Sequence, residues 1–162
     1  MGSQPWTTEA LRKEITAFLA AHHTVTLATI ADDGDAHAAS LLYAPEGLSI
    51  VWTSDPDTRH SRHLESRPRV MATIAPDYSD FRAIRGLQIQ GEASRLNAIA
   101  DIARAQGLMV ARYSFLAQLA AAPATLLKAW QKAAFYRLSP RRITLIDNTR
   151  GFGHKATLEV TP

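Results

Sequence analysis

The sequence predicts an α+β fold in which antiparallel strands form a barrel-like sheet with helices at its side. Apolar segments with the two-residue alternation typical of strands follow one another through residues 24–96, mostly with connections too short for parallel crossovers. An alanine-rich helical region then occupies residues 97–134, and a helix precedes the first strand. Neither a repeat nor a linker divides the chain, so residues 1–162 are expected to form a single domain.

The first element is expected to be an amphipathic helix. Thr7 or Thr8 has the side-chain oxygen that an N-cap requires, and the helical pattern ends near His22. Four apolar side chains recur at helical spacing and define one face: Leu11, Ile15, Phe18 and Leu19.

Three strands follow in close succession. Residues 24–30 and 36–43 form a hairpin around the turn at 32–35, whose glycine can adopt a positive φ. A second turn at 45–47 leads into a third strand at 48–53. Connections this short join antiparallel neighbours.

The second half of the chain continues the sheet after a helical interruption. Gly91 interrupts a long alternating segment and is expected to mark a β-bulge. The alanine-rich region predicts two or three helices. Four further strands are expected: residues 70–75, 83–96, 135–138 and 142–146.

The most informative segment is residues 58–67, which predict a short helix directly after the third strand. Leu64 is its only aliphatic residue, so an apolar stripe cannot be what mainly holds it. Backbone N–H groups at a helix start lack internal partners, and the helix dipole favours an anion there. Thr58 and Arg59 can both donate to phosphate oxygens. Two interpretations remain open: a phosphate site, or a solvated helix that carries Arg59, His60, Arg62 and His63 for solubility.

Composition excludes several classes of function. The absence of cysteine rules out disulfides, thiolate chemistry and cysteine-based metal sites. The net charge of +3 permits an anionic ligand without indicating nucleic acid. No apolar run reaches the roughly 18 residues of a membrane helix, and the N-terminus lacks a signal-peptide pattern. We therefore expect a cytoplasmic protein that binds neither membranes nor nucleic acid.

Other patterns carry less weight. The glycine-flanked basic loop at 151–155 begins a loose G-x-G-x-x-A string, but the residues after Ala156 are too few for the helix of a dinucleotide fold. His60 and His63 can share a helix face, but no carboxylate has a suitable spacing, so no metal site is predicted. Trp52 is open between core packing and cofactor contact. Three other side chains are simplest as core or interface residues: Met71, Met109 and Trp130.

Several motifs together carry a resemblance to a known family. They are Asp33-Gly34, Trp52-Thr53, Thr58-Arg59-His60, Arg67-Pro68-Arg69-Val70, Gly91-Glu92-Ala93, Phe135-Tyr136-Arg137-Leu138-Ser139-Pro140, Ile146-Asp147-Asn148 and Gly151-Phe152-Gly153-His154-Lys155. In this order and spacing they resemble the FMN-binding split barrels of the pyridoxamine 5′-phosphate oxidase-like superfamily, and the ending looks like a small uncharacterised branch of it. The resemblance implies a six-stranded antiparallel split β-barrel with flanking helices and one FMN-binding domain.

The resemblance also implies which residues hold the cofactor. A strand segment matching His37 to Leu41 would run along the isoalloxazine, and Lys155 matches a late basic residue of the family. The family usually has lysine where this chain has His60, and its early-strand arginine falls near Ala36, so one phosphate anchor is missing. The cofactor-binding residues expected on this basis, including the backbone near Gln88, are His37, Ala38, Ala39, Ser40, Trp52, Thr53, Thr58, Arg59, His60, Gln88 and Lys155.

The function implied is that of an FMN-dependent oxidoreductase acting on an unidentified small molecule. The flavin would perform the redox chemistry while the protein supplies binding and orientation, so no catalytic side chain is assigned. Two alternatives remain: a non-enzymatic FMN or haem module that acts as carrier, sensor or scavenger, and a deazaflavin-dependent reductase with the same barrel. The substrate-phosphate residues of the true oxidase have no match, so pyridoxamine phosphate oxidation is not predicted.

A homodimer is expected as well. The resemblance implies two-fold pairing with each FMN touching both chains, Arg59 coming from one chain and the stretch near Lys155 from the other. The composition adds a second reason, since a barrel of this size cannot easily bury every apolar strand residue and also cover the alanine-rich helices. The residues in question are Leu41, Leu42, Val51, Trp52, Met71, Ile74, Leu87 and Ile89.

Overall fold

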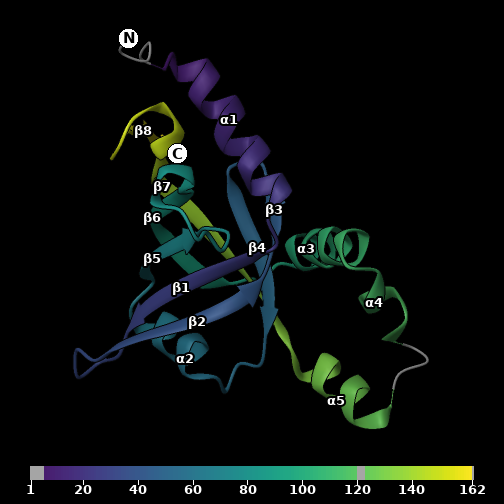
Figure 1. Ribbon diagram of the computed structural model, residues 1–162. Helices are drawn as coiled ribbons and strands as arrows, with labels where there is room; N and C mark the ends of the chain where they lie inside the picture. The colour runs from purple at the N-terminus through teal and green to yellow at the C-terminus, as the bar shows by residue number, and fades with distance from the viewer. Residues whose placement is uncertain (1–5, 120–122, 162) are drawn as a thin grey trace.

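The computed structural model describes residues 6–119 and 123–161 and confirms the predicted α+β fold. An antiparallel sheet curls into a half-barrel, and helices flank it (Figure 1). The short strands β3 and β8 extend a set of six longer strands. The strand bounds are β1 Thr24–Ile30, β2 Ala36–Leu42, β3 Ala44–Glu46, β4 Ser49–Ser54, β5 Arg69–Ile74, β6 Arg85–Arg95, β7 Ala134–Asp147 and β8 Lys155–Glu159.

The strand order leaves the barrel open along one side. Neighbouring strands follow the order β2-β1-β5-β6-β7-β4-β3, and β8 pairs with β7 outside this path. β2 and β4 contact each other, but no strand pairing joins them. We call this opening the β2–β4 split.

Two segments predicted as separate strands belong to one continuous strand. The expected segments 135–138 and 142–146 form the continuous strand β7, which runs through Pro140. The register shifts at Gly91, where Gln90 pairs with Arg142 while Gly91 pairs with Pro140. This confirms the predicted bulge at Gly91. A bulge tolerates proline, which has no N–H to donate, so the strand does not have to end there.

The helices largely match the expectations. Thr7 caps α1, its Oγ1 accepting a hydrogen bond from the Ala10 backbone N–H at 3.2 Å, and the predicted apolar face of α1 is buried. Three helices of the described chain lie in the alanine-rich region. The bounds are α1 Thr8–Ala21, α2 Arg59–Ser66, α3 Ile99–Arg112, α4 Ser114–Ala117 and α5 Ala124–Lys132, with 3-10 turns η1 Phe81–Ala83 and η3 Asn148–Arg150. No described helix is long and apolar enough to cross a membrane.

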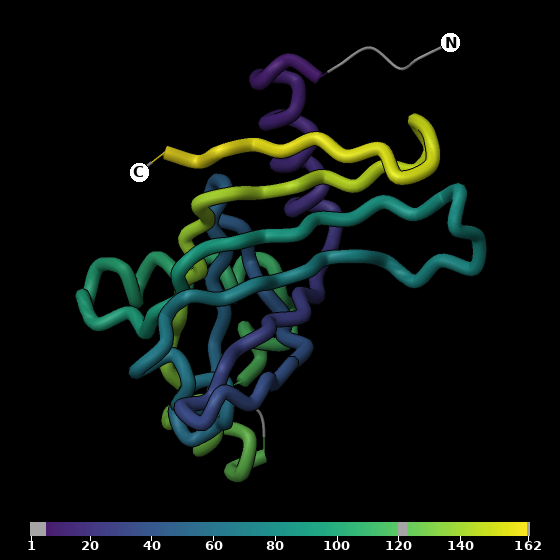
Figure 2. The backbone as a smooth tube through the Cα atoms, turned by 90° about the vertical axis from the view of Figure 1, so that its left-hand side faces the viewer, coloured from purple at the N-terminus to yellow at the C-terminus, as the bar shows by residue number. Residues whose placement is uncertain are grey.

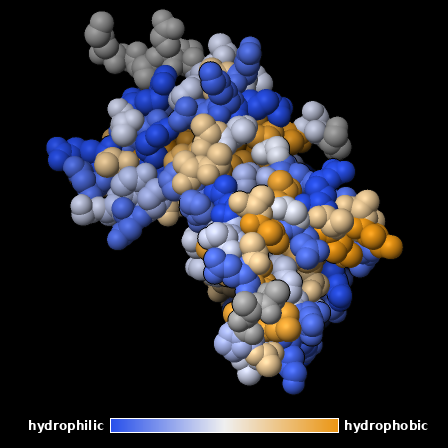
Figure 3. Space-filling model, turned by 90° about the vertical axis from the view of Figure 1, so that its right-hand side faces the viewer, coloured by the Kyte–Doolittle hydropathy of each residue, from blue (hydrophilic) through white to orange (hydrophobic). Residues whose placement is uncertain are grey.

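One subunit buries most of the apolar strand residues, contrary to the premise of the dimer expectation. Five of those eight side chains are buried within the barrel or against α3, because the half-barrel and the helical side have separate cores. Leu42 and Met71 are the well-exposed ones, at 43% and 39%. Met109 lies in the core on the helical side, which agrees with its prediction as a core or interface residue. Exposed apolar surface therefore gathers at few places, among them the face that carries α3–α5 (Figure 3).

The bulge leads to a prediction about stability. A Cβ at Gly91 would lie 2.2 Å from the Ser139 carbonyl oxygen and 2.9 Å from Pro140 Cα, both backbone atoms that cannot move cheaply. We expect Gly91→Ala to lower the free energy of unfolding by about 3 kcal/mol in urea denaturation. Gly107→Ala is the matched control: no atom lies within 4 Å of its Cβ, and it should stabilise α3 by roughly 0.5–1 kcal/mol. Equal effects of the two changes would contradict this account of the bulge.

Candidate functional site

The β2–β4 split exposes one side of the β2 backbone. β2 pairs with β1 over its whole length, from Thr24↔Leu42 to Ile30↔Ala36, and with no other strand. An edge strand of this kind presents unpaired N–H and C=O groups. The segment expected to line a cofactor ring, residues 37–40, therefore lies on a free strand edge.

An apolar groove of about 360 Å³ lies beside this edge. Its wall opposite the sheet comes from α3, α4 and α5, on the face seen in Figure 3. Ser40 and Thr53 are the polar members of the lining, which contains no charged side chain. The lining residues are Ser40, Leu41, Leu42, Thr53, Met109, Phe115, Leu116, Leu119, Leu126, Ala129, Trp130 and Ala133.

Sequence reasoning found the strand side of this groove and missed the helical side. Ser40 and Thr53 were both expected site residues. The sequence predicts Trp130 as a core or interface residue. In the structure it is partly buried, lines the groove and packs edge-on against Phe135, with 5.8 Å between the ring centroids. Helical spacing of apolar residues does not distinguish a core face from a groove wall, so the pattern offered no signal.

β4 leads directly into the start of α2. Thr58 is the N-cap in extended conformation, and its hydroxyl donates to the Asp55 carbonyl at 2.9 Å. Arg59, the first helical residue, is exposed and has no hydrogen-bond or ion-pair partner within the described ranges. Its guanidinium is therefore free to meet an anion from solvent, which is compatible with both interpretations of this helix, the phosphate site and the solvated surface.

His60 occupies a different place from the one expected. Only 6% of it is exposed, and Nε2 lies 2.8 Å from Ser54 Oγ and 3.2 Å from Thr58 Oγ1. Burial lowers the pKa of His60 below the usual 6.5, and the nearby His37 and His63 lower it further. At neutral pH in this arrangement the imidazole is thus uncharged and engaged by two hydroxyls, and only Arg59 of the expected basic pair presents a permanent charge.

Three histidines meet between β1, β2 and α2. The His37 ring lies parallel to that of His60 at 6.3 Å and edge-on to that of His63 at 5.9 Å. His63 Nδ1 is 3.0 Å from Oγ1 of Thr29, a fully buried residue whose register partner on β2 is His37. No set of three or more His, Asp or Glu side chains in the described chain is arranged to hold a metal ion. We call His37, His60 and His63 the histidine cluster.

A lysine ties the helical wall to the start of α2. Lys132, the last residue of α5, lies 2.9 Å from Asp55 Oδ2 and 2.7 Å from Asp57 Oδ2. The backbone N–H of Asp57 and then Lys132 lower the pKa of the Asp55 carboxyl, and Lys132 lowers that of Asp57. The ion pairs place the groove beside the α2 start. The sequence carries no signal for them, because the partners are more than 70 positions apart.

The remaining expected residues lie elsewhere in one chain. Trp52 is fully buried and stacks on Tyr136 at 5.7 Å, so the structure gives it the core role. Gln88 faces outward on β6, and two strands, β1 and β5, lie between β6 and β2. Lys155 begins β8, at the opposite end of the molecule from α2 (Figures 1 and 2). Neither Gln88 nor Lys155 can join Arg59 at one site within a single subunit.

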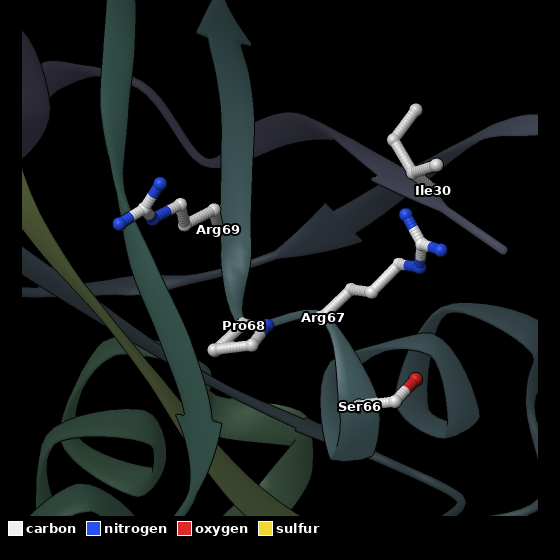
Figure 4. Close-up of a pocket in the computed structure, with 5 residues that line it drawn as sticks. All are labelled: Ile30, Ser66, Arg67, Pro68 and Arg69. Carbon is white, nitrogen blue, oxygen red and sulfur yellow. The ribbon is translucent and has the colours of Figure 1, made fainter. Parts of the chain in front are cut away.

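A second pocket lies at the far end of α2 and contains none of the expected residues (Figure 4). It has a volume of about 380 Å³, and its lining includes Ile30, Arg67 and Arg69. Arg67 donates to the Asp32 carbonyl at 3.0 Å. Since Arg67 is held by the β1–β2 turn and Arg69 lies 3.9 Å from Glu92 Oε1, neither arginine of this pocket is unpaired in the way that Arg59 is.

Comparisons with known proteins agree with this geometry. A family model described as pyridoxamine 5′-phosphate oxidase matches residues 11–148. A UPF0306 protein of Serratia proteamaculans is 32% identical over 89% of this chain and 92% of its own length. The structure of a conserved hypothetical protein of Mycobacterium tuberculosis is similar, with a TM-score of 0.71 and 22% identity over 93% of this chain and 91% of that one. A haem-binding protein of Mycobacterium smegmatis has a TM-score of 0.72 and 22% identity over 97% and 59% respectively. The two solved structures establish similarity of fold.

The buried His60 makes stability depend on pH. Its pKa is lowered in the folded protein, so between about 6.5 and that lower value the unfolded chain binds more protons. The free energy of unfolding should therefore fall as pH drops below about 6.5. His60→Gln should flatten this dependence in urea denaturation across that range, whereas His23→Gln, at an exposed position, should keep the wild-type slope. Identical slopes for wild type and His60→Gln would disprove this assignment.

Proposed function

Since the chain belongs to the pyridoxamine 5′-phosphate oxidase family, we propose that it binds FMN at the β2–β4 split and acts as an FMN-dependent oxidoreductase. One observation carries the proposal: a free strand edge, an apolar groove and an unpaired arginine at a helix start lie next to one another along the split. A phosphorylated flavin needs these three features, because its ring is planar and edged with polar groups and its tail is anionic.

The ring would lie along residues 37–41 of β2. Free backbone N–H and C=O groups there match the polar edge of the ring, and the aliphatic and aromatic side chains of the groove cover its faces. Bound FMN supplies hydride chemistry, so the protein needs to orient it and exclude water rather than provide an acid or base. The uncharged lining of the groove favours a small uncharged substrate.

The phosphate would lie at the start of α2. Its partners would be Arg59, the hydroxyl of Thr58 and the free N–H groups of the first turn. Ala36 stands where the family has an arginine, and His60 is buried where the family usually has lysine. Arg59 is therefore the main permanent charge available for phosphate recognition in this subunit.

Haem is the weaker candidate. The fold is shared with a haem-binding protein, but no histidine lines the groove, so haem would lack an imidazole ligand there. An absorbance spectrum of the freshly purified protein distinguishes the two. We expect flavin bands, FMN binding at least as tight as that of FAD, and reduction of the bound flavin by a nicotinamide donor. A Soret band, or no flavin binding, would overturn the proposal. A bound flavin that nicotinamide donors do not reduce would contradict the oxidoreductase and favour a carrier or sensor.

A second copy would complete the site. Uncharged polar side chains form a continuous row across the outer face of the sheet, each paired with the next in register: Ser40, Thr26, Thr73, Gln88, Thr144 and Thr157. Ser40 also lines the groove. A two-fold partner packed on this face would border the groove and could bring its Gln88 and Lys155 to the cofactor. We propose such a homodimer, with an interface of about 2,000 Å² or more.

Replacing Arg59 tests the phosphate site. Arg59→Ala should weaken FMN binding by about 1.5–3 kcal/mol, the usual worth of a hydrogen bond to a charged group, or about one to two decades in Kd. The melting temperature of the apo protein should stay the same, because Arg59 is exposed and unpaired in the described structure. Arg62→Ala, three residues along the same helix, is the control and should bind FMN normally. Unchanged affinity in folded Arg59→Ala would return α2 to the solvated-helix interpretation.

Mixing two variants tests the shared site. If Arg59 and Lys155 reach one FMN from different subunits, a heterodimer of Arg59→Ala and Lys155→Ala chains has one intact site and one doubly altered site. Fluorescence quenching should then recover about one tight FMN site per heterodimer. No recovery would place both residues in the same subunit, and a monomer that binds FMN tightly would remove the dimer altogether.

A further inference from the structure

We propose that the histidine cluster is a proton-binding counter-charge for the ligand phosphate, so that FMN binding and protonation of His37, His60 and His63 favour each other. The inference rests on the proposed function, since it concerns the same phosphate site. It adds regulation: affinity for the phosphorylated ligand rises as the cluster takes up protons.

The cluster adjoins the proposed phosphate position through His60. His60 is the second residue of α2, and its Nε2 is 3.2 Å from the hydroxyl of the N-cap Thr58. His37 and His63 stand within 6.3 Å of its ring or of each other's. A phosphate held by Thr58 and Arg59 would therefore lie next to the His60 imidazole, with the His37 and His63 rings behind it, and a nearby negative charge shifts the protonation of an imidazole.

Without an anion His60, the most buried member of the cluster, resists protonation. No carboxylate of the described chain forms an ion pair with any of the three imidazoles, and burial of His60, followed by the proximity of His37 and His63, lowers the pKa of His60. The charged groups of the surrounding elements either carry a positive charge or are carboxylates that already form ion pairs or hydrogen bonds with other residues. Arg59 and Arg62 are on α2, and Asp55 and Asp57 on the preceding loop are bound to Lys132. Asp32 on the β1–β2 turn is held by Ser66 and Arg67 and is the one carboxylate of the surrounding described elements that also interacts electrostatically with His63. β1 and β4 contribute the uncharged Thr29 and Ser54.

A phosphate dianion reverses this balance. A nearby negative charge favours the protonated form of an imidazole and offsets the repulsion within the cluster. Linkage is reciprocal, so whatever raises protonation on binding also raises affinity when protons are abundant. Lysine, which the family usually carries at position 60, would hold its charge across the physiological range. Histidine makes the counter-charge depend on pH near neutrality.

The test compares FMN binding by wild type and the His37→Gln/His63→Gln variant at about pH 8 and about pH 6. Both changed side chains are half-buried and neither belongs to the proposed phosphate contacts. The ratio of the two affinities should change about five- to tenfold in favour of wild type on acidification, as one unit of pKa shift allows. The phosphate's own titration near pH 6 affects both proteins equally and cancels in the ratio.

Two controls separate the cluster from general acid effects. Riboflavin lacks the phosphate, so its affinity ratio should not change with pH. His23→Gln, at an exposed position outside the cluster, should behave as wild type. If the double variant does not fold, calorimetry of wild type alone decides, because FMN binding in two buffers of different ionisation enthalpy should show net proton uptake near neutral pH.

The outcomes distinguish this inference from the proposed function. FMN binding with a constant affinity ratio, or without proton uptake, overturns the role of the cluster and leaves the flavin site intact. No flavin binding at either pH overturns the proposed function and this inference with it.

Discussion

The barrel cannot close between β2 and β4, and the rest of the molecule is arranged around that opening. β4 pairs with β7 on one side, and β3 occupies the start of its other side through Ala44↔Val51 and Pro45↔Ile50. β2 runs straight into β3 through Tyr43, a fully buried residue whose hydroxyl donates to the Leu19 carbonyl at 2.8 Å. Past Tyr43 the chain pairs with β4 as β3, whereas β2 pairs only with β1, so β2 remains an edge strand with unpaired backbone groups along the proposed site.

The elements beside the split are held by polar contacts to an unusual degree. α2 buries His60, Ser61 and Leu64, and the two polar residues are satisfied by the hydroxyls of Ser54 and Thr58. Buried polar groups are tolerated only with such partners. α5 has no buried residue and is tied down by Lys132. The barrel core, in contrast, is apolar and continuous. The apolar barrel core thus provides most of the stability, while the elements around the candidate site are held by hydrogen bonds and ion pairs.

Family membership and chain-specific residues carry different parts of the functional case. The family model gives the family and the solved structures give the fold, while the cofactor at the split is proposed from the geometry of this chain. Ala36 and the buried His60 stand where the resemblance implies cations, so Arg59 is left as the main permanent charge. The groove also has a helical wall, which the prediction of Ser40 and Thr53 as site residues did not indicate.

The sequence by itself determined the α+β class, a threonine cap at Thr7 or Thr8, the hairpin at Gly34, the bulge at Gly91 and the position of Arg59 at the start of α2, because each depends on local backbone chemistry or on periodicity. Only the tertiary structure decided that β7 passes through Pro140 without a break, that Trp52 faces the core, and that His60 turns inward while Lys155 lies at the far end. It also brought Lys132 to Asp55 and His37 to His63. These outcomes depend on which strand pairs with which and which face of a helix meets the sheet, and such contacts between distant residues leave no mark on a local pattern.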